Sequence, residues 1–462
     1  MNSEREDRIA EFFNAIHPHR QIRFQDDPSL DQDEPGALPA LPGSMYVEGM
    51  HDDGVDNPRR ALEKAIRRGL AADCYYWSGM RGSGKTTELL KLKQNLETQG
   101  NFAVFYADMS LVLQESEPVE VGDFLLLLLS ELASQVAQRF DVDLVSQGIG
   151  ARLLGFLKQE IVLEDVAWEP SFLFGAKFKF KAKQNPDFKR NLQKATRGRI
   201  DGLVQQARDF VSEIVRFLHA DTSSPKRLVY LVDSMERLRG IDNDSATKVF
   251  QSVENLFGYH RDKLRFADLT VVYSVPPYLS AVVSGAENNR VFSLTALKVF
   301  ERPESGCHGQ DHGPGLAKLL AVVTERFPGW REFFSEPAMR DLARCSGGDY
   351  REFFLLIRET LNLVDAEDVT DDGIPPQFIE HTRKLRRNEF EMNLASTDLE
   401  WLVRVVQSHD HGMRDREKDR PTLANYIDGK LIYRYRNGSY WWDVHPLLWD
   451  TVDAEIARRA VA

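Results

Sequence analysis

The feature of this sequence that most constrains its fold is a glycine-rich segment running from Gly79 to Thr86. It reads Gly-Met-Arg-Gly-Ser-Gly-Lys-Thr and fits the pattern G-x-x-x-x-G-K-[ST]. An apolar segment, 74–78, precedes it, and a helical pattern covers about 85–98. A strand, a glycine-rich turn and a helix in this order predict a phosphate-binding loop, whereas a chance match requires no such flanks.

Each part of this loop suits a polyphosphate ligand. Glycine lets backbone N–H groups turn toward the ligand, and the following helix adds the positive end of its dipole. Lys85 is expected to reach the β- and γ-phosphates, and Thr86 to place its hydroxyl on Mg²⁺. The residues of this segment predicted to bind nucleotide are Gly79, Arg81, Gly82, Ser83, Gly84, Lys85, Thr86 and Thr87.

A second metal ligand is expected from a neighbouring strand. In 228–233 an apolar run ends in Asp233, as expected for a buried parallel strand whose carboxyl end faces a ligand. We predict that Asp233 binds Mg²⁺ together with Thr86; the alternative is a carboxylate that caps a helix.

The residues after Asp233 bear on hydrolysis. Many hydrolytic P-loop ATPases have a glutamate directly after the metal-binding aspartate, but here Ser234 occupies that position. Glu236 is the nearest substitute for orienting the attacking water, and a surface acid is its alternative role. We therefore expect Lys85, Asp233 and Glu236 to be the catalytic residues and turnover to be slow.

Two later segments add candidate nucleotide contacts. The strand-like segment 270–274 ends in Ser274, which is placed to sense the γ-phosphate unless it is a plain strand end. The segment 346–351, Ser-Gly-Gly-Asp-Tyr-Arg, opens a helix. Its Arg351 is expected to fold over the phosphates, with an ordinary solvated arginine as the alternative.

Short apolar strands alternate with helices through the first two thirds of the chain. This alternation predicts an α/β fold, a doubly wound parallel-sheet P-loop NTPase core. We expect a helical lid after the core and a C-terminal winged-helix domain of three helices and a hairpin around Asn437-Gly438. The predicted regions are an N-terminal leader at 1–45, the core at 46–300, the lid at 301–380 and the winged helix at 381–462.

A basic insertion interrupts the core at about 165–200. Lys177, Lys179, Lys181 and Lys183 alternate with small or aromatic residues, which predicts a β-strand with one lysine face. Such a face suits a nucleic-acid backbone, but it also suits an edge strand protected by lysine or a docking surface for an acidic partner.

Bulk composition narrows the function classes. The net charge of −12 argues against broad, charge-driven binding of nucleic acid. Three cysteines spread along 462 residues suggest a reducing cytoplasm and no disulfide framework. The most apolar run, 124–129, is far shorter than the ~20 residues that span a bilayer, so we expect no membrane partner.

Taken in order, the segments GMRGSGKT, LVYLVDSMER, VVYS and GGDYR and the predicted winged helix resemble the AAA+ and STAND ATPases. The branch concerned contains origin-recognition initiators and NLR-like bacterial proteins. The second motif departs from the acid-rich form D-D-h-D-R, because Ser234 replaces one acid. The first motif and its flanks also resemble bacterial ATPases of anti-phage defence and mobile-element genes.

The resemblance implies ATP and Mg²⁺ as cofactors, with nucleotide binding coupling the core, lid and winged helix. It also implies homo-oligomers with an arginine finger from a neighbouring subunit, for which the candidates are Arg237, Arg239, Arg261 and Arg265.

Three functions follow as hypotheses. The first is a regulatory ATPase that switches a partner protein, in a bacterial defence system. The second is a DNA-associated initiator or loader that uses the basic insertion and winged helix. The third is a scaffold that keeps its nucleotide without hydrolysing it.

Overall fold

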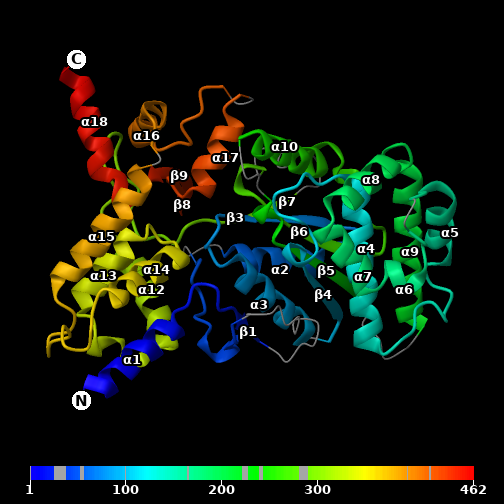
Figure 1. The fold of residues 1–462 in the computed structure, drawn as a ribbon, viewed down its shortest axis with the longest axis horizontal. Helices are drawn as coiled ribbons and strands as arrows, with labels where there is room; N and C mark the ends of the chain where they lie inside the picture. The colour runs from blue at the N-terminus through cyan, green and yellow to red at the C-terminus, as the bar shows by residue number, and fades with distance from the viewer. Residues whose placement is uncertain are drawn as a thin grey trace.

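The computed structural model describes residues 2–24, 38–52, 57–98, 100–163, 166–220, 227–238, 243–279, 290–392, 394–415 and 418–461. Of the predicted N-terminal leader, 1–45, residues 25–37 lie outside these ranges. Figure 1 shows a central sheet with a group of helices at one end and a second group, which includes both chain termini, at the other.

The core is built on a parallel sheet of five strands in the order β4-β5-β6-β3-β7. Alternate residues of the strands enter two hydrophobic clusters, so both faces of the sheet are covered. Helices α2 (Pro58–Arg68) and α3 (Lys85–Thr98) cover one face, and α4 (Val121–Phe140) lies on the other. The strands are β3 Cys74–Gly79, β4 Phe102–Asp108, β5 Arg227–Asp233, β6 Leu269–Val275 and β7 Arg290–Leu294.

This is the doubly wound parallel sheet of a P-loop NTPase fold that the sequence predicts. The phosphate-binding loop joins β3 to α3, and β3 lies between β6 and β7. Asp233 ends β5 at the same edge of the sheet, because all five strands run in parallel. Helix α10 (Asn243–Glu254) follows β5 and also packs on the sheet.

The insertion between α4 and β5 is helical, so the predicted lysine-faced strand is wrong. Its helices are α5 Ala151–Glu160, α6 Pro170–Leu173, α7 Ala176–Gln184, α8 Pro186–Arg197 and α9 Ile200–Ala220. On α7, Phe178 and Ala182 are four residues apart and buried, whereas Phe180 is 69% exposed. A helix turns about 100° per residue, so the alternating lysines point in different directions rather than along one face.

One of these lysines is committed to the fold. Lys179 forms an ion pair of 2.7 Å with Glu131 of α4. Helix α4 is long and apolar enough to cross a membrane by length and composition, but 83% of that window is buried inside the molecule. Its apolar character is therefore that of the central helix in this part of the core.

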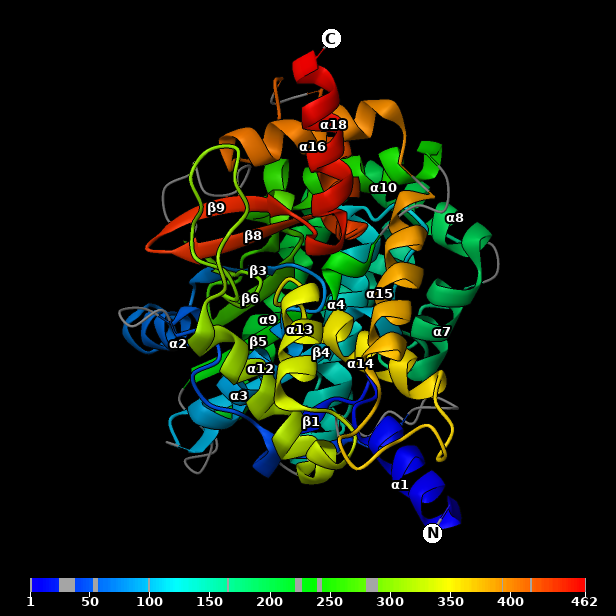
Figure 2. The same ribbon diagram turned by 90° about the vertical axis from the view of Figure 1, so that its left-hand side faces the viewer.

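The lid consists of α12 (Gly313–Arg326), α13 (Glu336–Cys345) and α14 (Tyr350–Asn362). The N-terminal helix α1 (Asn2–Ala15) packs on it, as Figure 2 also shows. Phe12 of α1 is fully buried and stacks on Phe327 with ring centroids 4.5 Å apart. Arg5 donates to the Val369 carbonyl at 2.7 Å. The start of the chain is thus part of the lid.

The C-terminal region contains α15 (Pro376–Glu391), α16 (Ser396–Ser408), α17 (Arg420–Asp428) and the hairpin β8–β9 (Ile432–Asn437, Ser439–Val444). A further helix, α18 (Trp449–Val461), follows the hairpin and was not predicted. Helix α15 packs on both α13 and α14, so it joins the lid to this region.

Helix α17 faces the ATPase core. Its Ala424 belongs to the same hydrophobic cluster as the sheet, and Arg420 forms an ion pair with Glu254 at the end of α10. It also packs against residues Pro277–Leu279, which directly follow β6. The face of α17 that contacts the core is therefore covered within the chain.

Candidate functional site

The phosphate-binding loop has the backbone shape that its glycines permit. Gly82 and Gly84 have φ values of 92° and 83°, in the left-handed region that residues with a side chain rarely adopt. Ser83 is buried, and its hydroxyl donates to the Met80 carbonyl at 2.8 Å. The loop is thus held in a fixed curve above the N-terminus of α3.

Lys85 lies at the centre of the site. Its Nζ donates to the carbonyl oxygens of Gly79 at 2.8 Å and Met80 at 3.0 Å, and lies 3.1 Å from Glu236 Oε1. The other oxygen of Glu236 accepts from the Ser274 hydroxyl at 2.8 Å. The sequence-predicted residues Lys85, Glu236 and Ser274 therefore form one connected group, with Ser274 holding a carboxylate.

Thr86 and Asp233 are also brought together. The Thr86 hydroxyl donates to Asp233 Oδ2 at 2.7 Å, and the Tyr106 hydroxyl donates to the same oxygen at 2.9 Å. Asp233 is fully buried, and its other oxygen, Oδ1, has no hydrogen-bond partner among the described residues. A hydroxyl beside a buried carboxylate with a free oxygen fits Mg²⁺, which prefers oxygen ligands.

The pKa values of the two acids of the site, Asp233 and Glu236, are shifted in opposite directions. Burial, followed by the nearby carboxylates of Glu236 and Asp108, raises the pKa of Asp233 to about 6. Burial also acts to raise the pKa of Glu236, but the Lys85 ammonium and the Ser274 hydroxyl outweigh it, so this pKa is lowered. Glu236 therefore loses its proton at a lower pH than Asp233 does.

A cavity of about 690 Å³ opens over the loop, between the core and the lid. Seven of its lining residues are arginine or lysine, and four are acidic. Each acid has a partner: Glu88 pairs with Arg59, Asp108 accepts from Ser110, Glu131 pairs with Lys179, and Glu236 with Lys85. The positive residues are Arg20, Arg23, Arg81, Lys85, Arg237, Arg326 and Arg351.

Arg351 and Arg81, both predicted from the sequence, line this cavity with Arg237. Burial lowers the pKa of Arg351, and the neighbouring Arg81 and Arg237 also act to lower it. Arg237 donates to the Ser110 hydroxyl at 3.2 Å, and nearby acids raise its pKa despite its burial. Like charges held this close favour an anion between them.

The lid contacts the loop directly. The Asp349 side chain caps α14 by accepting from the Glu352 backbone N–H at 2.8 Å. A Cβ on Gly82 would come within 2.7 Å of all three atoms of that carboxylate group. The Tyr350 ring lies over Gly84, 3.6 Å from where a Cβ would be. The start of α14 therefore sits against the phosphate-binding loop.

The C-terminal region also contacts the phosphate-binding loop and the start of α14. Lys430 forms ion pairs with Asp349 at 3.1 Å and Glu352 at 3.4 Å. The backbone N–H of Arg434 donates to the Met80 sulfur at 3.4 Å. The loop, the lid and the hairpin thus meet around Asp349.

The candidate arginine fingers have different locations. Arg237 lies in the cavity of its own chain, and Arg239 is outside the described residues. Arg261 and Arg265 precede β6, at the opposite edge of the sheet from the loop. Their position at that edge does not decide which of them could serve as the arginine finger.

Several lining residues were not predicted. Tyr106 on β4 reads as a buried strand residue, and only its contact with Asp233 reveals its place at the site. Residues 17–23, within the predicted leader, line the cavity as well. The excess of histidine and arginine in 17–23 was the available signal. Of the four lysines of the insertion, none lines this cavity.

No protein-family model matches the sequence, and no curated protein matches it. Among solved structures, the chain is similar to a Walker-type ATPase of Pyrococcus abyssi, PABY2304, with 12% identity and a TM-score of 0.37. That match covers 88% of this chain and 99% of the other. A second match, Cdc6p from Pyrobaculum aerophilum, has 12% identity and a TM-score of 0.36, covering 90% and 96%. At this identity and these TM-scores the two matches carry no argument about function, so the function is inferred from the geometry of the site.

Proposed function

We propose that this chain is an ATP-binding regulatory ATPase that uses Mg²⁺-ATP as a conformational switch. The observation that carries the proposal is the connected site at the edge of the sheet. Lys85 and Thr86 of the loop are joined there to Glu236 and Asp233, which lie in the turn after β5 and at the end of β5. This is the arrangement that holds a triphosphate and its metal in P-loop enzymes.

Each residue has a role in this proposal. The loop N–H groups and Lys85 would bind the phosphates, and Thr86 and Asp233 would hold Mg²⁺, which would supply positive charge to the phosphate oxygens. Glu236, ionised and oriented by Ser274, accepts a proton from the attacking water. Arg351 and Arg237 stabilise the charge on the terminal phosphate.

Slow turnover is supported by the environment of Glu236. Its carboxylate is tied to Lys85 and to Ser274, so it must leave Lys85 before it can orient water freely. Ser234, which stands where a glutamate is usual, has a φ of 69° and begins the short turn that carries Glu236. A long-lived nucleotide state suits a switch better than a motor.

The switch is proposed to act through the lid and the C-terminal region. Phosphate binding changes the charge next to Asp349, which contacts both the loop and Lys430. A change at the phosphates therefore alters the contact between the lid and the hairpin. The output is proposed to be a conformation or assembly that a partner protein recognises.

The test is a comparison of the pure protein with ADP and with a slowly hydrolysed ATP analogue, both with Mg²⁺. Small-angle scattering and sedimentation are expected to show a change in size or assembly with the ATP analogue only. Co-purifying proteins are identified by mass spectrometry. Identical size and shape in the two nucleotide states would contradict a switch.

No observation favours the DNA-associated alternative. The basic segment is helical, Lys179 is paired, and α17, the helix directly before the hairpin, packs on the core. DNA binding that weakens steeply with salt, and that is lost when Lys177, Lys181 and Lys183 become Glu, would restore it.

A further inference from the structure

The segment that follows α1 crosses the nucleotide cavity from the lid to the core. We define residues 17–24 as the bridging segment. At its start, α1 is anchored to the lid, where Phe12 is buried and Arg358 of α14 donates to the Phe13 carbonyl. At its end, β1 (Ile22–Arg23) pairs in parallel with β2 (Leu41–Pro42) and contacts α3.

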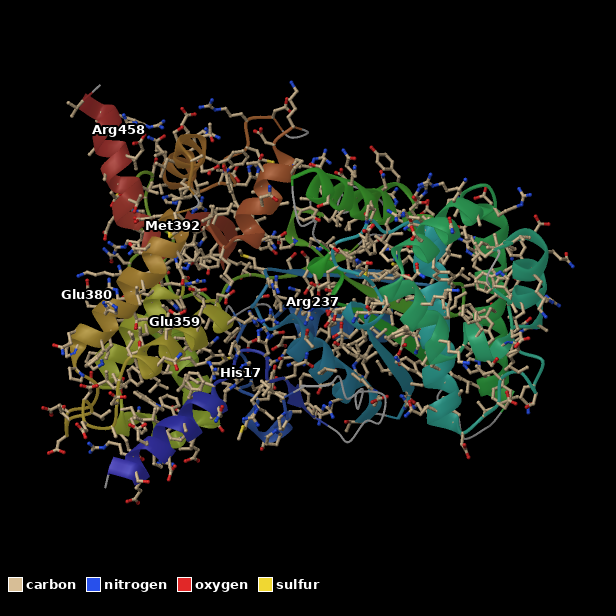
Figure 3. All side chains as sticks on the ribbon, viewed as in Figure 1. His17, Arg237, Glu359, Glu380, Met392 and Arg458 are labelled. Atoms are coloured by element: carbon tan, nitrogen blue, oxygen red, sulfur yellow. The ribbon has the colours of Figure 1, made fainter. Side chains whose placement is uncertain are left out.

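Contacts at the core end of the bridging segment fix its path. The Phe24 carbonyl accepts from the Gln94 side chain at 3.4 Å, and Lys91 lies 5.1 Å from the centre of the Phe24 ring. Residues 17–23 all line the cavity together with the phosphate-binding loop. Figure 3 shows His17 and Arg237 near the boundary between the lid and the core.

His19 lines the cavity together with Arg81, Arg237 and Arg351. The charged groups that act on it are Arg351 of α14, Arg81 of the loop, Arg237 after β5, and His17 of its own segment. All four are basic; Arg351 and Arg237 are the residues assigned above to the terminal phosphate, and Arg81 belongs to the phosphate-binding loop. His19 is exposed, so its ring is free to contact a ligand in the cavity.

We propose that His19 is a phosphate-binding residue, which in its protonated form donates a hydrogen bond to the terminal phosphate of the bound nucleotide. This inference rests on the proposed function, because it extends the same site to a residue from the N-terminal segment. The bridging segment then ties the terminal phosphate to α1 and the lid.

A linked proton follows from this geometry. Without nucleotide, partial burial and the positive charges of Arg351, His17, Arg237 and Arg81 lower the pKa of His19 below its ordinary value of 6.5. A bound triphosphate neutralises the three arginines and adds a negative partner, so this pKa rises. Between the two pKa values, binding takes up a proton, and affinity for ATP increases as pH falls.

The experiment measures proton uptake when the full chain binds a non-hydrolysable ATP analogue with Mg²⁺. Calorimetric titrations are run at pH 6.5 in two buffers with different ionisation enthalpies, for the wild type and for His19→Gln. On binding the analogue, the wild type is expected to take up as much as about one proton more than His19→Gln does. His19→Gln is expected to bind about tenfold more weakly at pH 6 and to approach the wild type at pH 8.

Two further titrations sharpen the result. ADP is expected to give little uptake that depends on His19, because it lacks the terminal phosphate. His381→Gln, a matched change on the exposed surface of α15, is expected to behave as the wild type. Thermal unfolding checks that His19→Gln is folded.

The outcomes separate the two claims. Equal proton uptake and equal affinity in the wild type and His19→Gln would overturn the role of His19 while leaving nucleotide binding intact. Equal uptake with ADP and the ATP analogue would overturn its assignment to the terminal phosphate. A wild type that binds no nucleotide would overturn the proposed function, and this inference with it.

Discussion

At the scale of single residues, the site is organised by Lys85 and the acid opposite it. The ammonium of Lys85 is shared between two loop carbonyls and Glu236, and Glu236 is shared between Lys85 and Ser274. Burial of both partners strengthens this contact relative to one in water. In the proposed function, a nucleotide phosphate would compete with Glu236 for Lys85 and so release this acid toward the attacking water.

Glu236→Gln tests this role directly. Gln keeps the size and the hydrogen bond from Ser274 but cannot accept a proton, so ATP is expected to bind while phosphate release falls about a hundredfold. The measurement is single-turnover release of phosphate. Glu117→Gln, which changes an acid that does not line the cavity, serves as the control. Unchanged turnover in Glu236→Gln would remove Glu236 from catalysis.

The residues of the loop were the most predictable part of the site. Glycine at positions 82 and 84 permits the left-handed backbone there, so the local sequence alone implies the shape. Tyr106 and His19 were not predictable in the same way. Their roles depend on contacts across 127 residues to Asp233, or between the N-terminal segment and α14, which no local pattern encodes.

At the scale of elements, α14 is the connection between the loop and the C-terminal region. Its Glu352 is fully buried, accepts from Arg386 of α15 at 2.7 Å and lies 3.4 Å from Lys430. Burial acts to raise the pKa of Glu352, but Lys430 and Arg386 outweigh it and lower the pKa to about 2. One carboxylate thus joins three elements.

This arrangement predicts a pH dependence of stability. Because the pKa of Glu352 in the folded chain lies below its ordinary value of 4.5, the carboxylate stabilises the fold above pH 4.5. That contribution, about 3 kcal/mol, is lost as pH falls from 4.5 toward 2. Glu352→Gln is expected to lower stability at pH 7 by a similar amount and to show a weaker acid dependence in denaturant unfolding.

The comparison variant for this prediction is Glu380→Gln, an exposed acid on α15. It is expected to change stability by less than about 0.5 kcal/mol at any pH. If Glu352→Gln and the wild type lost stability in parallel between pH 5 and 3, Glu352 would not carry the acid dependence.

The docking of α17 is a second prediction at this scale. Arg420 and Glu254 form a partly buried ion pair between α17 and α10, worth about 1 kcal/mol. Arg420→Glu is therefore expected to raise amide hydrogen exchange in α17 roughly fivefold. Adding Glu254→Arg should restore the wild-type rate, and no restoration would mean that the pair does not hold the helix.

The elements themselves were predicted unevenly, for a physical reason. Buried strands such as β5 and helices such as α3 were located to within a residue, because burial on fixed faces leaves a strong periodic pattern. The prediction for the α7 segment was wrong because alternating lysine and phenylalanine residues also fit the pattern of a β-strand. Its packing on α8 and α4, which favours a helix, is a tertiary effect.

At the scale of the whole molecule, the cavity lies where four parts of the chain meet. The phosphate-binding loop, the bridging segment and the lid line the cavity. The hairpin region does not line it but contacts both the lid and the loop. The positive lining means that a polyanion stabilises the closed arrangement by binding all sides at once. The sequence predicted these regions in order but not that the N-terminal segment joins them.

The central claim is that Mg²⁺-ATP binds at the loop through Lys85. The most direct measurement is an equilibrium titration of the wild type and Lys85→Ala with fluorescent ATP in the presence of Mg²⁺. The account predicts saturable binding by the wild type, and a loss of affinity of at least about a hundredfold in a folded Lys85→Ala variant. Equally tight binding by Lys85→Ala would contradict it.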